Sequence, residues 1–599
     1  MYLFPEMRLM GRNACADFTR KGFVLLLTLF GLTFLAACGG SGGSSTPAEH
    51  SSSAFGAGSL NGTYVFSSTG LDSTTEPLFL MMVGSLTANG SGGITGGTVD
   101  LIGVKVGVSS PAAQPITGGS YSVGTDGRGQ ISFDTTTRAG AVTITLDFVL
   151  TSSSHGLVTE YDSNGTGSGT IDLQSAITQS QLAGSYAFGV SGIGANGTSP
   201  TATVGAFTLD STGAVSTGLE DVNDAGGYSG APSQILTKSA VTLGTTPAAA
   251  TIASSAGTSY TFDVYPIDSG HLKFFENDSQ RLVSGDAYTQ GSSIPTGQLV
   301  FTLAGEDTSG RPLDSAGWLT NSSAAITAGL EDFNDGGSVS QANSVSGSIS
   351  AVSGGRSVLS LGGFANGAAN NIPGNYRFAA YPFTFSGGGT GIQLLEIDGL
   401  GITSGAAYAQ TSTALAASQE YGLNLSGLNL NEVGINETIN VEEDDIAEFT
   451  TTTSGLSGLV DLHTDGMLTF NNTLTGSFPT TVDSNGRGTA TTTSFDFDFY
   501  VVNNSTFLLL VTDTQIGTGV FELQSATVGP SAEPGVSPLH PAPISEFAPG
   551  PRPGCNVYNL RIDLRFDGHQ REMRALGGSD AEESRQDNRF GICSADCFT

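Results

Sequence analysis

Alternating apolar and polar residues recur along the chain in short runs that are separated by turn sequences. In Ile144-x-Leu146-x-Phe148 every second side chain is apolar, which is typical of a β-strand with one buried face. Asp126-Gly127 stands between two such runs and supplies the positive φ that a tight hairpin needs. The pattern predicts eight strands, near residues 62–68, 78–87, 93–103, 117–124, 128–134, 141–151, 155–162 and 167–174. Eight short sequential strands can close as an up-and-down barrel or pack as a β-sandwich, and we expect the barrel.

The strand pattern occurs four times, with three sequence markers in the same order. The first is an aromatic start, Gly-x-Tyr-x-Phe, which begins at Gly62 and Gly184 and is looser at Gly297 and Tyr421. The second is Gly-x-x-Asp, whose aspartate is Asp100, Asp221, Asp332 or Asp461. The third is a Ser-Gly or Thr-Gly pair followed by a glutamine at Gln174, Gln290, Gln410 and Gln524. The markers predict an all-β protein of four tandem antiparallel units of about 115 residues, at 59–175, 181–290, 295–410 and 418–524.

Short linkers join the predicted units, for example residues 292–296 and 411–417. We therefore expect neighbouring units to touch or to form a semi-rigid row. The composition agrees with the all-β class, because 85 of the 599 residues are glycine and only 13% are charged. The units contain no cysteine, so their stability must come from burial and strand pairing.

The N-terminal segment has the pattern of a signal peptide. A charged stretch that ends at Lys21 precedes an apolar run over residues 23–34. A helix needs about 20 apolar residues to cross a bilayer, so this run is too short to be a membrane span. The pattern predicts a signal peptide over residues 1–37.

The residues that follow the apolar run are Leu35-Ala36-Ala37-Cys38, and they resemble the lipobox of bacterial lipoproteins. The resemblance implies that the chain is cut before Cys38 and that the cysteine sulfur carries a lipid. In that family an aspartate after the cysteine favours retention in the inner membrane. Gly39 stands there instead, so the resemblance points to the outer membrane.

Both segments that flank the units differ from them in composition. Residues 38–58 are small and polar after the cysteine, as in a flexible tether. After Gln524 the sequence becomes rich in proline and then in arginine, and we expect residues 525–599 to be disordered; a C-terminus from a shifted reading frame is the alternative. In an oxidising compartment Cys555, Cys593 and Cys597 would form one disulfide with one cysteine left over.

The acidic charge balance argues against two classes of partner. The net charge is −33, and residues 60–524 contain only ten lysines and arginines. Nucleic acids and anionic lipid surfaces are bound through cationic side chains. We therefore expect neither as a partner, and we expect the membrane to be reached through the lipid.

A Glu-x-Asp pair precedes the Ser-Gly pair in three units and is the first candidate for chemistry. Residues i and i+2 of a strand lie on one face, so the two carboxylates could bind a cation or ligand, or act as an acid–base pair. A solvated strand face is the alternative, and the fourth unit has Leu510 and Thr512 where the acids would stand. The candidate ligand-binding residues are Glu160, Asp162, Glu276, Asp278, Glu396 and Asp398.

Two loops that contain the Gly-x-x-Asp aspartate are rich in oxygen ligands and are candidate calcium sites. They lack the spacing and the distal glutamate of an EF-hand, and Asx turns are the alternative. The candidate calcium-binding residues are Asp221, Asn223, Asp224, Asp332, Asn334 and Asp335.

No set of residues predicts a catalytic site. His155 and His271 occupy equivalent places before the Glu-x-Asp strand, and we expect both to be solvated turn residues. The Ser-Gly pairs lack the context of a nucleophile elbow, and close approach of two strands explains their glycine better.

These features together predict an exported, lipid-anchored, non-catalytic lipoprotein of the outer membrane or cell surface. It would act in adhesion, binding or envelope structure, with a cell-surface polymer or protein as partner and no cofactor. One alternative is a glycan-binding, small-ligand-binding or glycan-active protein that uses the barrel mouths or the Glu-x-Asp carboxylates. The other is a repeat protein stabilised by calcium.

Overall fold

The computed structural model describes residues 55–525, apart from residues 74–78, 104–112, 138–139, 195–198, 225–226, 229, 279, 364–375, 386–387, 417, 434–438, 454 and 465. The predicted signal peptide, Cys38 and the tail from residue 526 lie outside the described residues. All described residues belong to one unit, Met1–Glu546.

Each copy of the repeat folds as a closed antiparallel barrel, so the all-β prediction and the choice of a barrel over a sandwich are confirmed. In barrel 1 all eight predicted strands form, and the barrel closes where Tyr64 of the first strand pairs with Leu173 of the last. The 3₁₀-helix η1 (Ala57–Ser59) precedes the barrel. The strands are β1 (Asn61–Asp72), β2 (Phe79–Asn89), β3 (Gly93–Ile102), β4 (Gln114–Val123), β5 (Arg128–Thr137), β6 (Gly140–Leu150), β7 (His155–Tyr161) and β8 (Gly165–Leu173).

Barrels 2 and 3 have two short strands where barrel 1 has its fourth strand. Barrel 2 follows the 3₁₀-helix η2 (Gln179–Leu182) and contains β9 (Gly184–Gly194), β10 (Pro200–Leu209), β11 (Val215–Asp224), β12 (Ser233–Gln234), β13 (Ala240–Thr242), β14 (Ala248–Ala253), β15 (Ser259–Asp268), β16 (His271–Glu276) and β17 (Arg281–Gln290). Barrel 3 contains β18 (Gly297–Asp307), β19 (Pro312–Asn321), β20 (Ala325–Asp335), β21 (Ser338–Ser344), β22 (Ser346–Ile349), β23 (Ser357–Gly362), β24 (Tyr376–Thr384), β25 (Thr390–Glu396) and β26 (Gly401–Ala409).

Barrel 4 has eight strands and closes by pairing between the first and the last. They are β27 (Glu420–Val433), β28 (Ile439–Thr451), β29 (Leu456–Thr464), β30 (Met467–Ser477), β31 (Arg487–Thr492), β32 (Asp496–Val501), β33 (Thr506–Val511) and β34 (Gln515–Leu523). Within the described residues no helix has the length and apolar character that a membrane span requires.

The interior of every barrel is filled with apolar side chains from its own strands. Each barrel has a separate cluster of buried residues, with Phe133 in barrel 1, Phe262 in barrel 2, Phe378 in barrel 3 and Phe521 in barrel 4. An eight-stranded barrel is just wide enough to be filled in this way. Burial of these side chains is therefore the main source of each barrel's stability.

Close approach of the first and last strands explains the Ser-Gly pairs. A Cβ atom on Gly169 would lie 1.9 Å from the Ser67 oxygen, and one on Gly285 would lie 2.1 Å from the Gly189 oxygen. No side chain larger than hydrogen fits at these positions, which confirms the prediction made from the sequence.

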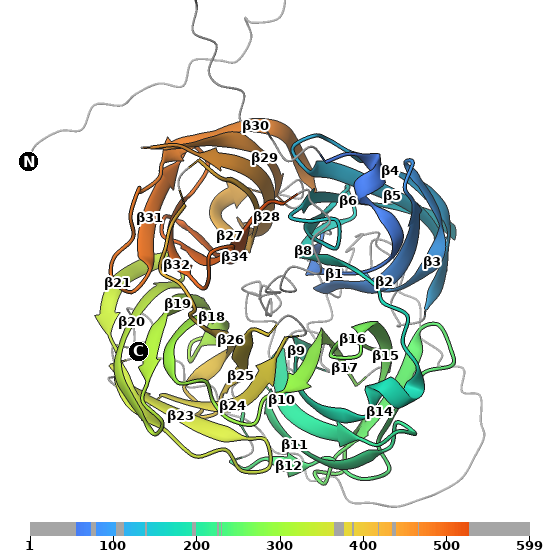
Figure 1. Cartoon of the computed structure of the whole chain (residues 1–599), viewed down its shortest axis with the longest axis vertical. Coiled ribbons are helices and arrows are strands. Elements are labelled where there is room, and N and C mark those ends of the chain that lie inside the picture. Colours follow the sequence, from blue (N-terminus) through green and yellow to red (C-terminus); the bar gives the residue numbers. More distant parts are fainter. Residues whose placement is uncertain are drawn as a thin grey trace, which may run out of the picture. The chain divides into compact units, whose positions relative to one another are not determined.

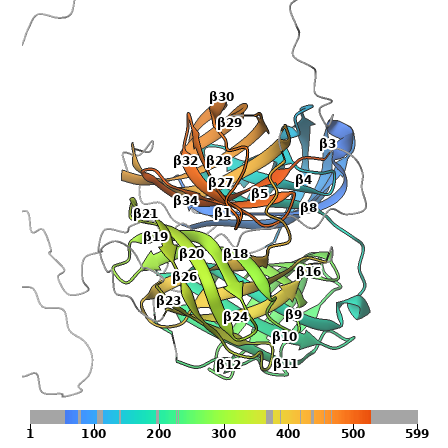
Figure 2. The ribbon, with the colours of Figure 1, turned by 60° about the vertical axis from the view of Figure 1, so that its left-hand side comes forward.

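The four barrels follow one another around a common centre, with the first and last strands of each barrel turned inward (Figure 1). Barrels 1 and 4 lie side by side, as do barrels 2 and 3 (Figure 2). One apolar cluster at the centre takes side chains from all four barrels, among them Leu157, Tyr288, Tyr408 and Leu508. The units therefore touch, as expected, but they close into a ring and not a row.

We call the contact surface between two neighbouring barrels a seam. Each seam is defined by the Gly-x-x-Asp aspartate of one barrel and its partner in the next: Asp100 with Tyr265 in seam 1–2, Asp221 with Tyr381 in seam 2–3, Asp332 with Tyr500 in seam 3–4, and Asp461 with Arg128 in seam 4–1.

Candidate functional site

The Gly-x-x-Asp aspartates are buried in the seams and accept hydrogen bonds from the next barrel. The Tyr265 hydroxyl donates to Asp100 over 2.7 Å, and the Tyr381 hydroxyl donates to Asp221 over the same distance. Tyr500 donates to Asp332 in the same way. The strand that carries each tyrosine, β15, β24 or β32, is equivalent in the three barrels. The Gly-x-x-Asp aspartate thus joins its barrel to the next one, and we call it the docking aspartate.

Arginines reinforce three of the four seams. The Arg356 Nε and Nη2 atoms lie 2.6 and 2.8 Å from the two carboxylate oxygens of Asp221, which is a bidentate pair. Arg487 Nε lies 2.7 Å from Asp332, and Arg128 Nη2 lies 3.2 Å from Asp461. Hydrogen bonds to the aspartates raise the pKa of Arg356 and of Arg487 although burial alone would lower it. These pairs orient neighbouring barrels more specifically than apolar contact could.

The glutamine that closes each copy also reaches the next barrel. Gln410 Nε2 donates to the main-chain oxygens of Asn485 (3.0 Å) and Val501 (2.6 Å). Gln524 makes the equivalent bonds from barrel 4 to barrel 1, and Gln174 donates to Pro266 over 2.6 Å. The bonds made by Gln524 close the ring.

Main-chain hydrogen bonds from the residue after each glutamine repeat around the ring. The donors and acceptors are Ser175 to Ile267, Gly291 to Pro382, Thr411 to Val502 and Ser525 to Thr151, over 2.7–2.9 Å.

The aspartate of each Glu-x-Asp pair caps main-chain groups. Asp162 accepts from the N–H groups of Thr145 (3.0 Å) and Asn164 (2.7 Å). Asp278 and Asp398 accept from equivalent N–H groups in barrels 2 and 3. These oxygens hold a turn and a neighbouring strand together.

Barrel 4 keeps this capping aspartate one residue later than the spacing of the other three copies predicts. Asp513 accepts from the N–H groups of Asp496 (2.9 Å) and Gln515 (2.8 Å). The preceding strand position that corresponds to the glutamate is Val511, because Val511 pairs with Phe497 as Glu276 pairs with Phe262. The assignment of Leu510 and Thr512 to these positions was wrong because the turn in barrel 4 is one residue shorter.

The glutamates of the Glu-x-Asp pairs face the interior of their own barrels. Glu160 stands opposite Leu146 and Glu396 opposite Phe378, and both apolar partners belong to interior clusters. Glu160, Glu276 and Glu396 are buried, so a solvated strand face does not describe them.

Each glutamate has a different environment. Arg281 lies 3.1 Å from Glu276, and the hydroxyl of Thr403 donates to Glu396 over 2.8 Å. Neither oxygen of Glu160 has a hydrogen-bond partner among the described residues. Burial raises the pKa of Glu160 and of Glu396 well above the usual range, and it raises that of Glu276 to about 8 although Arg281 opposes the shift. Buried acids of this kind are held mainly in the protonated form near neutral pH.

The candidate calcium loops provide contacts across the seams. Asn223 donates to the main-chain oxygens of Glu396 (2.9 Å) and Gly401 (3.1 Å), and Asn334 donates to that of Gln515 over 2.8 Å. Asp335 accepts from Arg311, while Asp224 is exposed. Among the described residues no group of three or more His, Cys, Asp or Glu side chains is arranged to hold a metal ion. The side chains of each loop thus point to several different partners.

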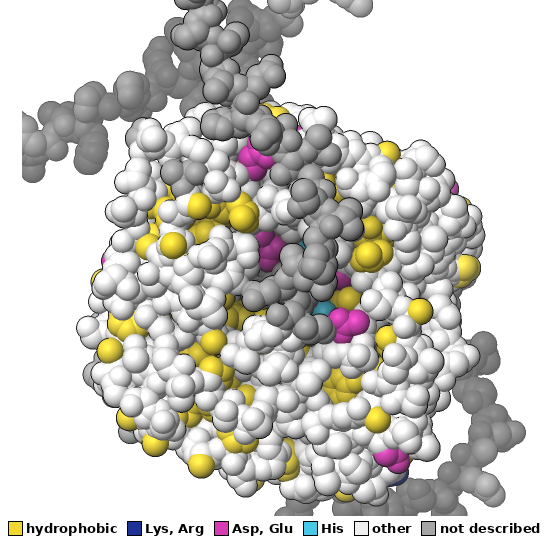
Figure 3. Space-filling view, viewed as in Figure 1, with side chains coloured by type: hydrophobic (Ala, Val, Ile, Leu, Met, Phe, Trp, Pro, Cys, Tyr) yellow, Lys and Arg dark blue, Asp and Glu magenta, His cyan; other side chains and the backbone are white. Residues whose placement is uncertain are grey.

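Two histidines that we expected to be solvated are buried near the ring centre. His155 Nδ1 lies 2.7 Å from Asp172, and its Nε2 lies 3.2 Å from Glu522 of barrel 4. Burial lowers the pKa of His155, but the two carboxylates outweigh burial and raise it to about 10. Near the centre of the face shown in Figure 3, histidine and acidic side chains are visible between the barrels.

The second histidine belongs to a similar ion-pair group. His271 Nε2 and Lys273 Nζ lie 2.7 and 3.1 Å from Asp286. Burial would raise the pKa of Asp286, but Lys273 and His271 lower it to about 2. The solvated-turn prediction was wrong because a strand that lies at the ring centre is buried on both faces. Asp286 follows His271 by 15 residues, and Asp172 follows His155 by 17 residues. Each carboxylate therefore stands on the next strand of the hairpin, and the spacing alone could have indicated the pair.

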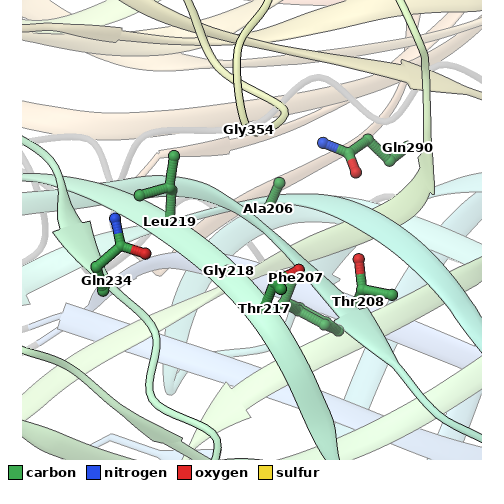
Figure 4. Close-up of a pocket in the computed structure, with 9 residues that line it drawn as sticks. All are labelled: Ala206, Phe207, Thr208, Thr217, Gly218, Leu219, Gln234, Gln290 and Gly354. Carbon is green, nitrogen blue, oxygen red and sulfur yellow. The ribbon is translucent and has the colours of Figure 1, made fainter.

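A pocket of about 340 Å³ lies at seam 2–3 (Figure 4). It is lined by Leu219, by threonines of β10 and β11, by the amides of Gln234 and Gln290, and by Gly354 of barrel 3. None of the described residues that line it is charged. Within the described part of the chain, Gln290 makes no side-chain hydrogen bond to the next barrel, unlike the other three terminal glutamines. The pocket can therefore offer hydrogen bonds to a neutral molecule.

No protein-family model matches the chain, and no curated protein is similar to it in sequence. The evidence for a function therefore lies in the geometry of the ring and in the sequences that flank it.

Proposed function

We propose that this chain is a non-catalytic lipoprotein of the cell envelope, tethered through Cys38, whose four barrels act as one rigid platform in adhesion, binding or envelope structure. The observation that carries the proposal is the use of the repeated polar residues. The Gly-x-x-Asp aspartates and the terminal glutamines bond neighbouring barrels to each other. The polar residues that recur in the four copies are thus residues that hold the ring together.

The filled barrels support the same proposal. Apolar side chains occupy all four interiors, so the mouths of the barrels lead to packed cores. A ligand that binds in a barrel lumen would have to displace that core, at a cost of several kcal/mol for each large side chain. Partners would instead bind on the outer faces of the ring.

A rigid ring changes how the four repeats would contribute to binding. Flexibly linked domains gain affinity because each bound domain raises the effective concentration of the next. In a ring the relative positions of the four outer faces are fixed, so a partner with matching spacing pays less entropy on binding. We expect a repetitive cell-surface polymer or protein as the partner.

Two experiments test the proposal in parts. Cys38→Ala should move the chain from the membrane fraction to the soluble fraction of cells, and unchanged membrane association would refute the lipid anchor. Attachment of the intact chain to whole cells should exceed that of any single barrel by at least tenfold. Equal attachment by one barrel and by the ring would refute the platform.

The pocket at seam 2–3 favours a second candidate function, the binding of a small neutral ligand. Its volume lies at the lower end of the range of ligand sites, and its polar groups are amides and hydroxyls. Saturation-transfer NMR with glucose and N-acetylglucosamine would test this candidate. Signals that persist when Gln234 and Gln290 are both changed to alanine would show that the pocket is not the site.

A further inference from the structure

Seam 1–2 lacks the arginine that holds the docking aspartate in the other three seams. Arg487 is the first residue of β31 and stands opposite Tyr500 in the strand register. In barrel 2, Ala248 pairs with Val264, so Pro247 stands opposite Tyr265. Pro247 therefore takes the position that Arg128, Arg356 and Arg487 hold in barrels 1, 3 and 4.

Two carboxyl groups remain in seam 1–2 although the cation is missing. In seam 3–4, Arg487 joins Asp332 (2.7 Å) to Asp498 (2.6 Å), which lies two residues before Tyr500. Asp263 lies two residues before Tyr265 and corresponds to Asp498. The charge of Asp263 therefore acts on Asp100, and among the described residues no lysine or arginine forms an ion pair with either carboxyl group.

Asp100 is fully buried beside an apolar cluster that fills seam 1–2. Its Oδ2 accepts from Tyr265 over 2.7 Å, and its Oδ1 has no partner among the described residues. Val83 on β2 pairs with Asp100 and belongs to this apolar cluster. Phe275 of barrel 2 belongs to the same cluster. Burial and then the charge of Asp263 raise the pKa of Asp100 to about 8, and the hydrogen bond from Tyr265 offsets only part of this shift.

Two described cations on the neighbouring strands of barrel 2, Lys273 and Arg281, are already paired. Lys273 stands opposite Tyr265 on β16 and lies 3.1 Å from Asp286. Arg281 on β17 lies 3.1 Å from Glu276. The apolar cluster of the seam takes its barrel 1 members from β1, β2 and β3, and none of them is titratable.

We propose that a proton on Asp100, on which the charge of Asp263 acts, takes the place of the missing arginine, so that seam 1–2 is a proton-controlled joint that opens as the pH rises. A metal ion fits less well, because calcium takes six to eight oxygen ligands and the two carboxyl groups with Tyr265 offer far fewer. The inference does not depend on the lipid anchor or on the platform function.

The expected direction follows from the raised pKa. The proton favours the closed seam fully below about pH 4, the value of an exposed aspartate, and this contribution is lost as the pH rises to about 8. One proton changes the opening equilibrium by at most about tenfold for each pH unit.

Hydrogen exchange of the full chain, followed by mass spectrometry, tests the proposal. The measured quantity is the ratio of two protection factors, that of β3 and β15 at seam 1–2 and that of β20 and β32 at seam 3–4. The intrinsic pH dependence of exchange cancels in this ratio. This ratio should fall by up to about tenfold for each pH unit between pH 5 and 8 and then level off. Asp100→Asn should abolish the slope, and Pro247→Arg should keep the ratio high at pH 9.

Several outcomes would overturn the proposal. A ratio that does not change with pH in the unmodified chain would do so, as would an unchanged slope in Asp100→Asn. If calcium raises the ratio and a chelator lowers it at constant pH, the occupant is a metal ion and not a proton. Should Pro247→Arg fail to fold, Asp263→Asn gives the second test, because it removes the charge that helps to raise the pKa of Asp100 and should reduce the slope.

Discussion

At the level of single residues, buried carboxyl groups take opposite charge states at different places in the ring. Asp286 lies beside Lys273 and His271, which lower its pKa to about 2, so it is charged at neutral pH. Glu396 is equally buried but has no cation beside it among the residues that the structure describes, and burial raises its pKa well above the usual range. A buried carboxyl is thus stabilised either by a partner of opposite charge or by a proton.

This contrast gives a prediction for substitution by the neutral isostere. Glu396→Gln should change the melting temperature little at pH 5 and should raise it at pH 9, because ionisation of the native glutamate weakens the fold as the pH rises. Asp286→Asn is the matched control and should lower the melting temperature at both pH values, since it leaves Lys273 buried without its anion. If Glu396→Gln lowers the melting temperature at pH 9, Glu396 is ionised in the folded protein.

At the scale of strands and turns, the alternation of side chains predicted all eight strands of barrel 1. The prediction worked because most of these strands have one face toward the barrel core. It was less informative for β8, whose residues are nearly all buried, because this strand also faces the ring centre. The position of Asp513 was missed because fixed spacing assumes turns of equal length.

The sequence showed which residues recur, but it did not show that these residues join one barrel to the next. The aspartate and glutamine markers were visible as repeats, yet nothing in one copy shows that the partner lies in the next. The arginines were missed because Arg128, Arg356 and Arg487 recur in only three copies. The sequence Tyr-Pro occurs at residues 265–266 and again at 381–382. Only the ring shows that Tyr265 and Tyr381 donate hydrogen bonds to Asp100 and Asp221.

The terminal glutamines give a prediction at the scale of the linkers between barrels. Gln410→Ala should reduce the free energy of unfolding by about 1–3 kcal/mol, because two main-chain oxygens of barrel 4 lose a donor. Gln290→Ala is the matched control and should change it by less than about 0.5 kcal/mol, since this side chain lines the pocket. Urea unfolding measures both, and equal effects would contradict the assignment.

At the scale of the whole molecule, many buried acids make the stability of the ring depend on pH. Asp100, Glu276 and Asp314 each have a pKa raised to about 8. Burial is the first cause in every case. Because protons bind more tightly to the folded state, the stability that these groups contribute is lost as the pH rises from about 4 to about 8.

We therefore predict that the chain is more stable in mild acid than in mild base. The melting temperature should be highest between about pH 4 and 6 and should decline toward pH 9. Below about pH 4 it should fall again, because Asp172 and Asp286 have lowered pKa values and lose their ion pairs when protonated. A melting temperature that rises steadily from pH 5 to 9 would contradict the assignment of protonated buried acids.

The four barrels form one closed body, and the contact between barrel 4 and barrel 1 is the most specific consequence of that closure. Asp461 of barrel 4 pairs with Arg128 of barrel 1, although the two residues are far apart in the sequence. The most direct test is hydrogen exchange of the full chain with and without Asp461→Ala. A closed ring predicts faster exchange in β5 and β7 of barrel 1, with β15 of barrel 2 unchanged. Exchange in barrel 1 that does not respond to this change in barrel 4 would contradict the ring.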